Sequence, residues 1–124
     1  MDTKQKEAEM GNPVVHFEVL GKDASKLRDF YSKMFDWNMQ VMPEMDYGLV
    51  DNGGRGINGG IGVGEASHAT FYVEVDDPQA HLDKIEAAGG KTTMPVTVIP
   101  DMVTFAMFTD PEGNLVGLVK ADAS

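Results

Sequence analysis

One pattern occurs twice in the 124-residue chain and constrains its fold more than any other feature. The segment HFEV at residues 16–19 and the segment TFYV at residues 70–73 have the same build, and each leads through an aspartate-containing turn into a stretch of helical period. Side chains alternate between the two faces of a strand, so each segment presents one apolar face and one polar face. The sequence therefore predicts two copies of one supersecondary unit, each with an apolar face that a helix covers.

The first unit is predicted over residues 13–66. It opens with a strand over Val14–Leu20, and a helix follows for which Asp23 is the expected N-cap residue. The apolar stripe of this helix consists of Leu27, Phe30, Tyr31 and Met34. We expect the stripe to pack on the apolar face of the opening strand, because its residues recur at helical spacing. Three further strands complete the unit, and the last is the glycine-rich stretch at residues 57–64.

The second unit, residues 67–121, repeats this order. Its opening strand, Ala69–Val75, precedes a helix with Asp77 as the N-cap residue and Pro78 at the first helical position. Three more strands follow, and Pro95 is expected to interrupt the first of them. The sequence thus predicts an α+β fold of two βαβββ modules, whose curved mixed β-sheets form a cup with one helix packed on each sheet.

Composition limits the domain organisation and the partners. Residues 13–124 are expected to form one domain, preceded by a flexible tail over residues 1–12 that does not resemble a signal peptide. No apolar run reaches membrane-spanning length, so we predict a cytoplasmic protein. The formal net charge of −10 disfavours nucleic acid and anionic membranes as partners. The chain contains no cysteine, which excludes thiol nucleophiles and thiolate metal sites.

The polar faces of the two opening strands supply the candidate site residues. His16 and Glu18 share the polar face of the first strand, and that of the second carries His68, Thr70 and Tyr72. His16 is a candidate hydrogen-bonding group or proton carrier for a ligand. The alternative is a neutral, structural histidine that is bonded to Glu18 or to a backbone carbonyl.

Glu18 is a candidate general base, although a buried carboxylate must be paired, solvated or protonated. The two arginines of the chain, Arg28 and Arg55, are its expected partners. Aromatic side chains offer stacking surfaces for a planar ligand, and they are Trp37, Tyr47, Tyr72 and Phe105. Methionines such as Met107 serve either as core filler or as an adaptable ligand wall.

Four segments carry a resemblance to a known family. They are VVHFEVL, DFYSKMFDW, FYVEVDDPQAHLDKIEAAGG and FTDPEGNLVGLV, and they extend over nearly the whole chain from Val14 to Lys120. With these segments the chain resembles the vicinal oxygen chelate superfamily, which contains glyoxalase I, bleomycin-resistance proteins and extradiol dioxygenases. The nearest similarity is to single-domain bacterial glyoxalase-related proteins. The resemblance implies the same two-module cup.

In the metal-dependent members, four strand residues hold one divalent ion at the floor of the cup. The resemblance places His16 at the first position, no ligand in the glycine-rich strand, Thr70 at the third position and Gly117 at the fourth. An open metal site usually needs about three protein ligands, so we expect neither a metal nor another cofactor. The alternative is a displaced site for Zn, Ni, Fe or Mn that uses His16, His68 and a strand glutamate.

The resemblance implies a metal-independent protein that sequesters or senses a planar or amphipathic compound in a cup at the interface of a homodimer. The candidate ligand-binding residues are His16, Glu18, Trp37, His68, Thr70, Tyr72, Phe105, Met107 and Gly117. One alternative is a glyoxalase-type lyase or isomerase for an α-hydroxycarbonyl compound, with a divalent metal or with His16 or Glu18 as the base. A ligand-free interaction module is the other alternative, so enzymatic activity is left open.

Overall fold

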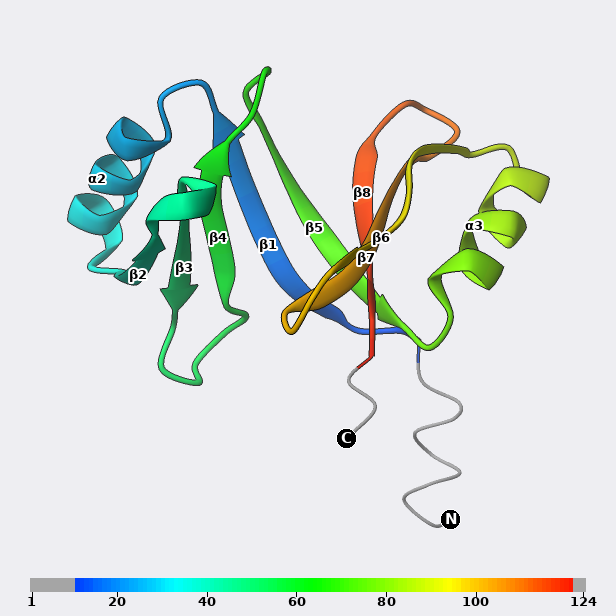
Figure 1. Cartoon of the computed structure of the whole chain (residues 1–124), viewed down its shortest axis with the longest axis horizontal. Helices are drawn as coiled ribbons and strands as arrows, with labels where there is room; N and C mark the ends of the chain where they lie inside the picture. Colours follow the sequence, from blue (N-terminus) through cyan, green and yellow to red (C-terminus); the bar gives the residue numbers. More distant parts are fainter. Residues whose placement is uncertain (1–10, 122–124) are drawn as a thin grey trace, which may run out of the picture.

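The computed structural model describes residues 11–121, which form two consecutive modules (Figure 1). The first module consists of β1 (Val14–Gly21), α2 (Ala24–Phe35), β2 (Asn38–Met42), a 3₁₀-helix (Pro43–Met45), β3 (Tyr47–Asp51) and β4 (Gly59–Val63). The second consists of β5 (His68–Val75), α3 (Pro78–Ala87), β6 (Lys91–Ile99), β7 (Val103–Thr109) and β8 (Leu115–Lys120). The expected tail falls outside the described residues, apart from Gly11 and Asn12.

The strands form a single sheet in the order β2-β3-β4-β1-β5-β8-β7-β6. The opening strands β1 and β5 pair antiparallel at its centre, while the β1–β4 and β5–β8 pairs are parallel. His16 lies opposite Tyr72, and Glu18 lies opposite Thr70. The two repeated strands therefore join the modules edge to edge, and the predicted α+β fold of two βαβββ modules is confirmed.

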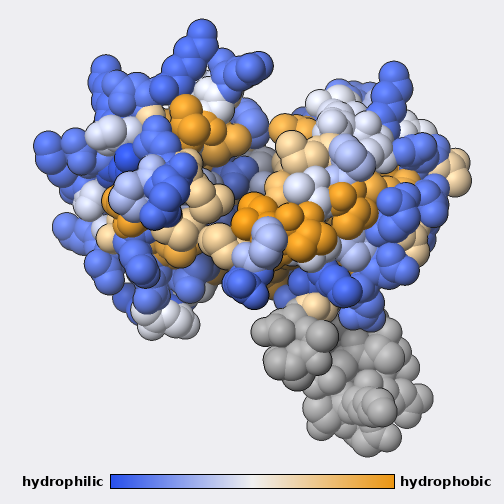
Figure 2. All heavy atoms as spheres, viewed as in Figure 1, coloured by the Kyte–Doolittle hydropathy of each residue, from blue (hydrophilic) through white to orange (hydrophobic). Residues whose placement is uncertain are grey.

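The helices lie on the outer sides of the two halves, α2 at one end of the molecule and α3 at the other (Figure 1). We call the sheet face that points away from the helices the inner face. Figure 2 shows a hollow between the two halves, with apolar side chains gathered beside it on the half that contains β6 and β7. No helix in the described part of the chain is both long enough and apolar enough to cross a membrane.

Both predicted helix starts are confirmed. The Asp23 side chain accepts a hydrogen bond from the Lys26 backbone N–H at 3.1 Å, and Asp77 accepts one from Ala80 N–H at 3.1 Å. Each bond satisfies one of the backbone donors that a helix leaves without a partner in its first turn. The loop aspartates therefore fix where the helices begin and how they return to the sheet.

The two modules bury their helices to different extents. In the second module, Leu82 of α3 packs with Val75, Ala106 and Leu118 in a cluster of buried side chains. In α2, by contrast, Leu27 and Tyr31 are half-buried, whereas Phe30 is 54% exposed and Met34 is 57% exposed. The expectation that all four residues of the stripe pack on β1 was therefore wrong. The stripe is wider than the contact, because α2 sits mainly over the glycine-rich strand β4.

The expected interruption at Pro95 does not divide the strand in two. Strand β6 runs from Lys91 to Ile99 and pairs only with β7, so it is the edge of the sheet. Its register against β7 shifts between Thr92 and Met94 and again between Met94 and Thr97. An edge position and irregular pairing both tolerate a residue that lacks an N–H donor.

Candidate ligand-binding site

A carboxylate lies between two tyrosine hydroxyl groups on the inner face. Tyr47 Oη donates a hydrogen bond to Glu18 Oε2 at 2.9 Å, and Tyr72 Oη donates one to Glu18 Oε1 at 3.0 Å. Burial is the main cause that raises the pKa of both tyrosines, and the Glu18 carboxylate raises it further. Both hydroxyls therefore keep their protons, and hydrogen bonds to an ionised acceptor are among the stronger ones in proteins.

Glycines make room for the two tyrosine rings. A Cβ atom added at Gly60 would lie 1.9 Å from Tyr47 Oη, and one at Gly62 would lie 2.5 Å from the same ring. A Cβ atom added at Gly117 would lie 2.3 Å from Tyr72 Cδ2. The glycine-rich strand β4 and the glycine in β8 are thus the surfaces on which the tyrosines rest. Close approach of another group explains glycine inside these strands.

The hydrogen bonds also fix the state of His16. Its Nε2 atom lies 2.9 Å from Tyr47 Oη, whose proton already goes to Glu18. The Tyr47 oxygen can then only accept, so Nε2 carries the hydrogen and Nδ1 is an acceptor in the neutral ring. Burial lowers the pKa of His16, although the Glu18 carboxylate opposes this shift, and the lowered pKa favours the neutral form.

The prediction that Arg28 or Arg55 pairs with Glu18 was wrong. Arg28 instead forms an ion pair with Asp46, with Nη2 lying 3.0 Å from Oδ1. Arg55 is exposed in the loop between β3 and β4. Neutral hydroxyl groups therefore satisfy the carboxylate, so its negative charge is retained on the inner face.

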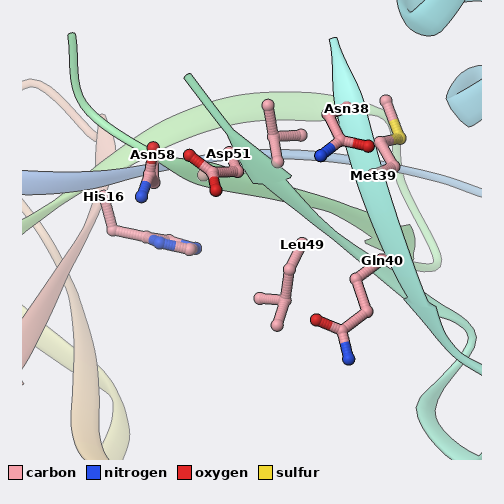
Figure 3. Close-up of a pocket in the computed structure, with 9 residues that line it drawn as sticks. His16, Asn38, Met39, Gln40, Leu49, Asp51 and Asn58 are labelled. Atoms are coloured by element: carbon pink, nitrogen blue, oxygen red, sulfur yellow. The ribbon is translucent and has the colours of Figure 1, made fainter. Parts of the chain in front are cut away.

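A cleft of about 320 Å³ lies beside His16, on the half of the inner face that the first module forms. Figure 3 shows Leu49 between the His16 ring and the Gln40 side chain, with Asp51 and Asn58 side by side next to His16. The remaining wall is formed by Asn38, Met39, Val50 and Gly59. The cleft thus combines an imidazole, a carboxylate and three carboxamides with a short apolar floor.

Strand register explains why these polar groups meet. Asn38 pairs with Asp51 across β2 and β3, and Val50 pairs with Gly59, which puts Asp51 beside Asn58. Phe17 pairs with Gly59 in turn, so His16 follows Asn58 in the same row. Five neighbouring strands therefore carry one row of polar side chains, which runs Asn38, Asp51, Asn58, His16, Tyr72.

The structure brings seven of the predicted site residues together, and His16 and Tyr72 are at the centre of the group. Glu18 bonds to Tyr72, the Phe105 ring lies 6.5 Å from the Tyr72 ring, and Met107 pairs with Gly117 beneath that ring. Thr70 lies opposite Glu18, but its hydroxyl group donates to the Leu115 carbonyl. The residues of this group are His16, Glu18, Thr70, Tyr72, Phe105, Met107 and Gly117.

Two predicted site residues lie elsewhere. The Trp37 ring is 5.2 Å from Phe17 and stacks on Tyr31 at 5.7 Å, on the face that α2 covers. His68 lies opposite Leu20 on β5, four residues from Tyr72, which is the partner of His16. The Nε2 atom of His68 is buried and has no hydrogen-bond partner among the described residues. Four residues of strand span about 13 Å, so His16 and His68 cannot share one ion.

The four family metal positions do not offer a ligand set here. His16 bonds to Tyr47, the Thr70 hydroxyl is used by a backbone carbonyl, and glycines covered by tyrosine rings occupy β4 and the position of Gly117. Within residues 11–121, no group of three or more His, Cys, Asp or Glu side chains is arranged to hold a metal ion. The donor set therefore does not suit a divalent ion.

Comparisons with known proteins agree with this fold. The profile of the Glyoxalase/Bleomycin resistance protein/Dioxygenase superfamily matches residues 14–118, so the chain belongs to this family. It is 29% identical over 110 residues to the curated "Putative glyoxylase CFP32" of Mycobacterium bovis, and the match covers 81% of this chain. The chain spans only 42% of that relative, and the same values hold for the Mycobacterium tuberculosis protein.

Solved structures show the same architecture at low sequence identity. A superfamily member from Vibrio splendidus has a TM-score of 0.64 and 14% identity, with 90% of this chain and 100% of that chain covered. Methylmalonyl-CoA epimerase from Mycobacterium tuberculosis has a TM-score of 0.63 and 11% identity, with 88% and 87% covered. At these identities the likeness concerns the fold alone.

Replacing Gly117 with alanine tests the support of the Tyr72 ring. The new methyl group would meet the ring, so we expect Gly117→Ala to lower the free energy of unfolding by about 1–3 kcal/mol, as overpacking does. Urea denaturation measures this change. Gly56→Ala is the matched control, because no atom lies within 4 Å of its added Cβ, and it should change stability by less than about 0.5 kcal/mol. Equal stability of the two variants would contradict the tight seat of Tyr72.

Proposed function

We propose that this protein binds a planar or amphipathic small molecule on its inner face without a metal ion, for sequestration or sensing. The observation that carries the proposal is the cleft beside His16, which is lined by polar side chains together with the apolar side chain of Leu49. A few placed polar groups in a concave, partly apolar site are typical of small-molecule recognition. An inner face filled by its own side chains would instead support a ligand-free interaction module.

The Glu18 network supports metal independence. Both carboxylate oxygens accept hydroxyl protons from tyrosines whose pKa is raised, so a metal ion would have to displace two strong hydrogen bonds. The Nε2 atom of His16 donates to Tyr47 and is therefore not available to an ion beside Glu18. Within this proposal the network takes the structural place that a metal ion has in other members of the family.

Metal content and thermal melting of the untagged protein test this proposal. We expect no stoichiometric metal and no change of melting temperature with a chelator. A resident ion at one hundred times its dissociation constant would stabilise the fold by about 2.7 kcal/mol. Its removal would lower the melting temperature of a chain this size by roughly 10 °C. Stoichiometric metal together with such a drop would overturn metal independence.

A second candidate function is a glyoxalase-type lyase or isomerase that acts on an α-hydroxycarbonyl compound. The chain of hydrogen bonds His16–Tyr47–Glu18 favours it, because a carboxylate behind the imidazole stabilises the protonated ring when His16 accepts a proton. The curated mycobacterial relatives carry the name putative glyoxylase, which agrees with this candidate.

Deuterium exchange tests this second candidate. Hydroxyacetone in D₂O should lose carbon-bound protons in the presence of the wild-type protein, and His16→Asn should abolish the exchange, because asparagine cannot take up the proton. Proton NMR measures the loss of signal. An absence of catalysed exchange in the wild type would rule out this activity on this compound class.

A homodimer is part of the proposal, and the exposed face of α2 supports it. Phe30 and Met34 line a shallow groove there beside Lys26, Asp29 and Lys33. Because the face carries both signs of charge, a second copy related by two-fold symmetry would meet opposite charges as well as apolar surface.

Sedimentation at micromolar concentration tests the dimer. We expect the wild type to sediment as a dimer and Phe30→Asp to sediment as a monomer, because a charge would be buried in the interface. Val98→Asp is the matched control, since Val98 is equally apolar and exposed but lies on the edge strand β6. A monomeric wild type, or a monomeric control variant, would contradict the α2 interface.

A further inference from the structure

The cleft beside His16 offers hydrogen-bond acceptors in fixed positions. The bond from Nε2 to Tyr47 leaves Nδ1 of His16 as an acceptor on the ring that projects into the cleft (Figure 3). The Tyr47 hydroxyl group is fixed by its hydrogen bond to Glu18. The His16 ring therefore cannot turn its N–H toward the cleft without losing the bond from Nε2 to Tyr47. A ligand therefore meets a nitrogen lone pair at this wall.

A second fixed acceptor lies in the same row as His16, on the far side of Asn58. Asp51 Oδ1 accepts the Gly53 backbone N–H at 2.8 Å, which orients the carboxylate at the end of β3. Asn58 Oδ1 accepts the Asn52 backbone N–H at 2.8 Å, so its amide nitrogen points away from that bond. The loop backbone thus uses one oxygen of each residue. The second carboxylate oxygen of Asp51 is available to a ligand.

The carboxamides of Asn38 and Gln40 can bond to a hydrogen-bond donor or to an acceptor of a ligand. Asn38 and Gln40 are exposed, and no hydrogen bond joins either carboxamide to another group within residues 11–121. Each carboxamide can donate or accept. Leu49, which is opposite Gln40 and lies between it and His16, supplies apolar surface (Figure 3). The selectivity of the cleft is therefore set by His16 and Asp51.

Charge around the cleft excludes anions. Its lining contains no lysine or arginine, while Asp51 lies in it and Glu18 occupies the neighbouring row of β1. The chain as a whole carries a formal charge of −10. Arg55 is the one cation of the adjoining loop at residues 52–58, and it lies outside the lining. The negative electrostatic potential of the cleft therefore favours a ligand that has hydrogen-bond donors and no negative charge.

We propose that the cleft recognises the N–H edge of a planar amide, amidine or guanidine group that is neutral or cationic. The N–H groups bond to His16 Nδ1 and to the Asp51 carboxylate, and the flat body lies against Leu49. This inference rests on the proposed binding function and names the ligand chemistry that the function requires.

Three probes of equal shape and different charge test the ligand class. Benzamidine is a cation, benzamide is neutral and benzoate is an anion at neutral pH. We would titrate each into the ¹⁵N-labelled full chain and follow the amide resonances by NMR. Benzamidine and benzamide should shift the signals of Asn38, Asp51 and Asn58, and benzoate should not.

Variants then locate the interaction. Asp51→Asn should weaken benzamidine binding at least about fivefold, because it removes a charge-assisted acceptor, and it should affect benzamide less. Asp101→Asn is the matched control, since it removes the same charge from the exposed turn between β6 and β7. Asn38→Asp adds a carboxylate beside Asp51 and should strengthen benzamidine binding, which keeps the test informative if Asp51→Asn unfolds the chain.

The outcomes separate the ligand class from the binding function. Benzoate binding as tight as benzamidine binding, with shifts at the same residues, would overturn the ligand class and leave the binding function standing. Equal effects of Asp51→Asn and Asp101→Asn would also overturn the assignment, because binding would then follow net charge alone. An absence of shifts at the cleft with all three probes would overturn both proposals.

Discussion

The position of the Glu18 carboxylate between the hydroxyl groups of Tyr47 and Tyr72 organises the inner face. Tyr47 comes from β3 of the first module and Tyr72 from β5 of the second, so the network spans the junction of the two modules. A half-buried carboxylate would be costly without donors, and two hydroxyl groups supply them without adding positive charge. The same hydroxyl of Tyr47 fixes the His16 ring, and glycines beneath both rings make the arrangement sterically possible.

The sheet has near two-fold symmetry, but its inner face does not. The row of polar side chains runs from β2 to β5 and ends at Tyr72. Beyond it, Phe105 of β7 lies beside the Tyr72 ring and Met107 is buried. These two residues lie outside the lining of the cleft, so only a ligand that extends past Tyr72 would reach Phe105. The amphipathic ligand predicted from the sequence suits this division, which arises because the two modules carry different residues at equivalent inner positions.

Local sequence rules predicted the scaffold, and long-range register decided the site. The repeated strands, the caps at Asp23 and Asp77 and the alternation of faces are local patterns, so the sequence was sufficient for them. The hydrogen-bond donors of Glu18 are 29 and 54 residues away in the sequence, and only the pairing of the strands brings them to the carboxylate. Local patterns do not contain this information, and the prediction of an arginine partner was wrong. Gly60 and Gly62 of β4 were the available signal, because they indicate that some group approaches closely, although not that it is a tyrosine.

Charge and strand spacing together explain why the cleft should discriminate among ligands. Glu18 on β1 and Asp51 on β3 are separated by the width of one strand, and adjacent strands lie about 4.8 Å apart. The register also offsets them by two residues along the strands, so their backbones are about 12 Å apart, and a group midway between them lies about 6 Å from each, within the Debye length of about 8 Å at physiological salt. A ligand between them experiences both charges with little screening, while the rest of the acidic surface is largely screened. Discrimination against anions therefore depends on these two carboxylates more than on the net charge of the chain.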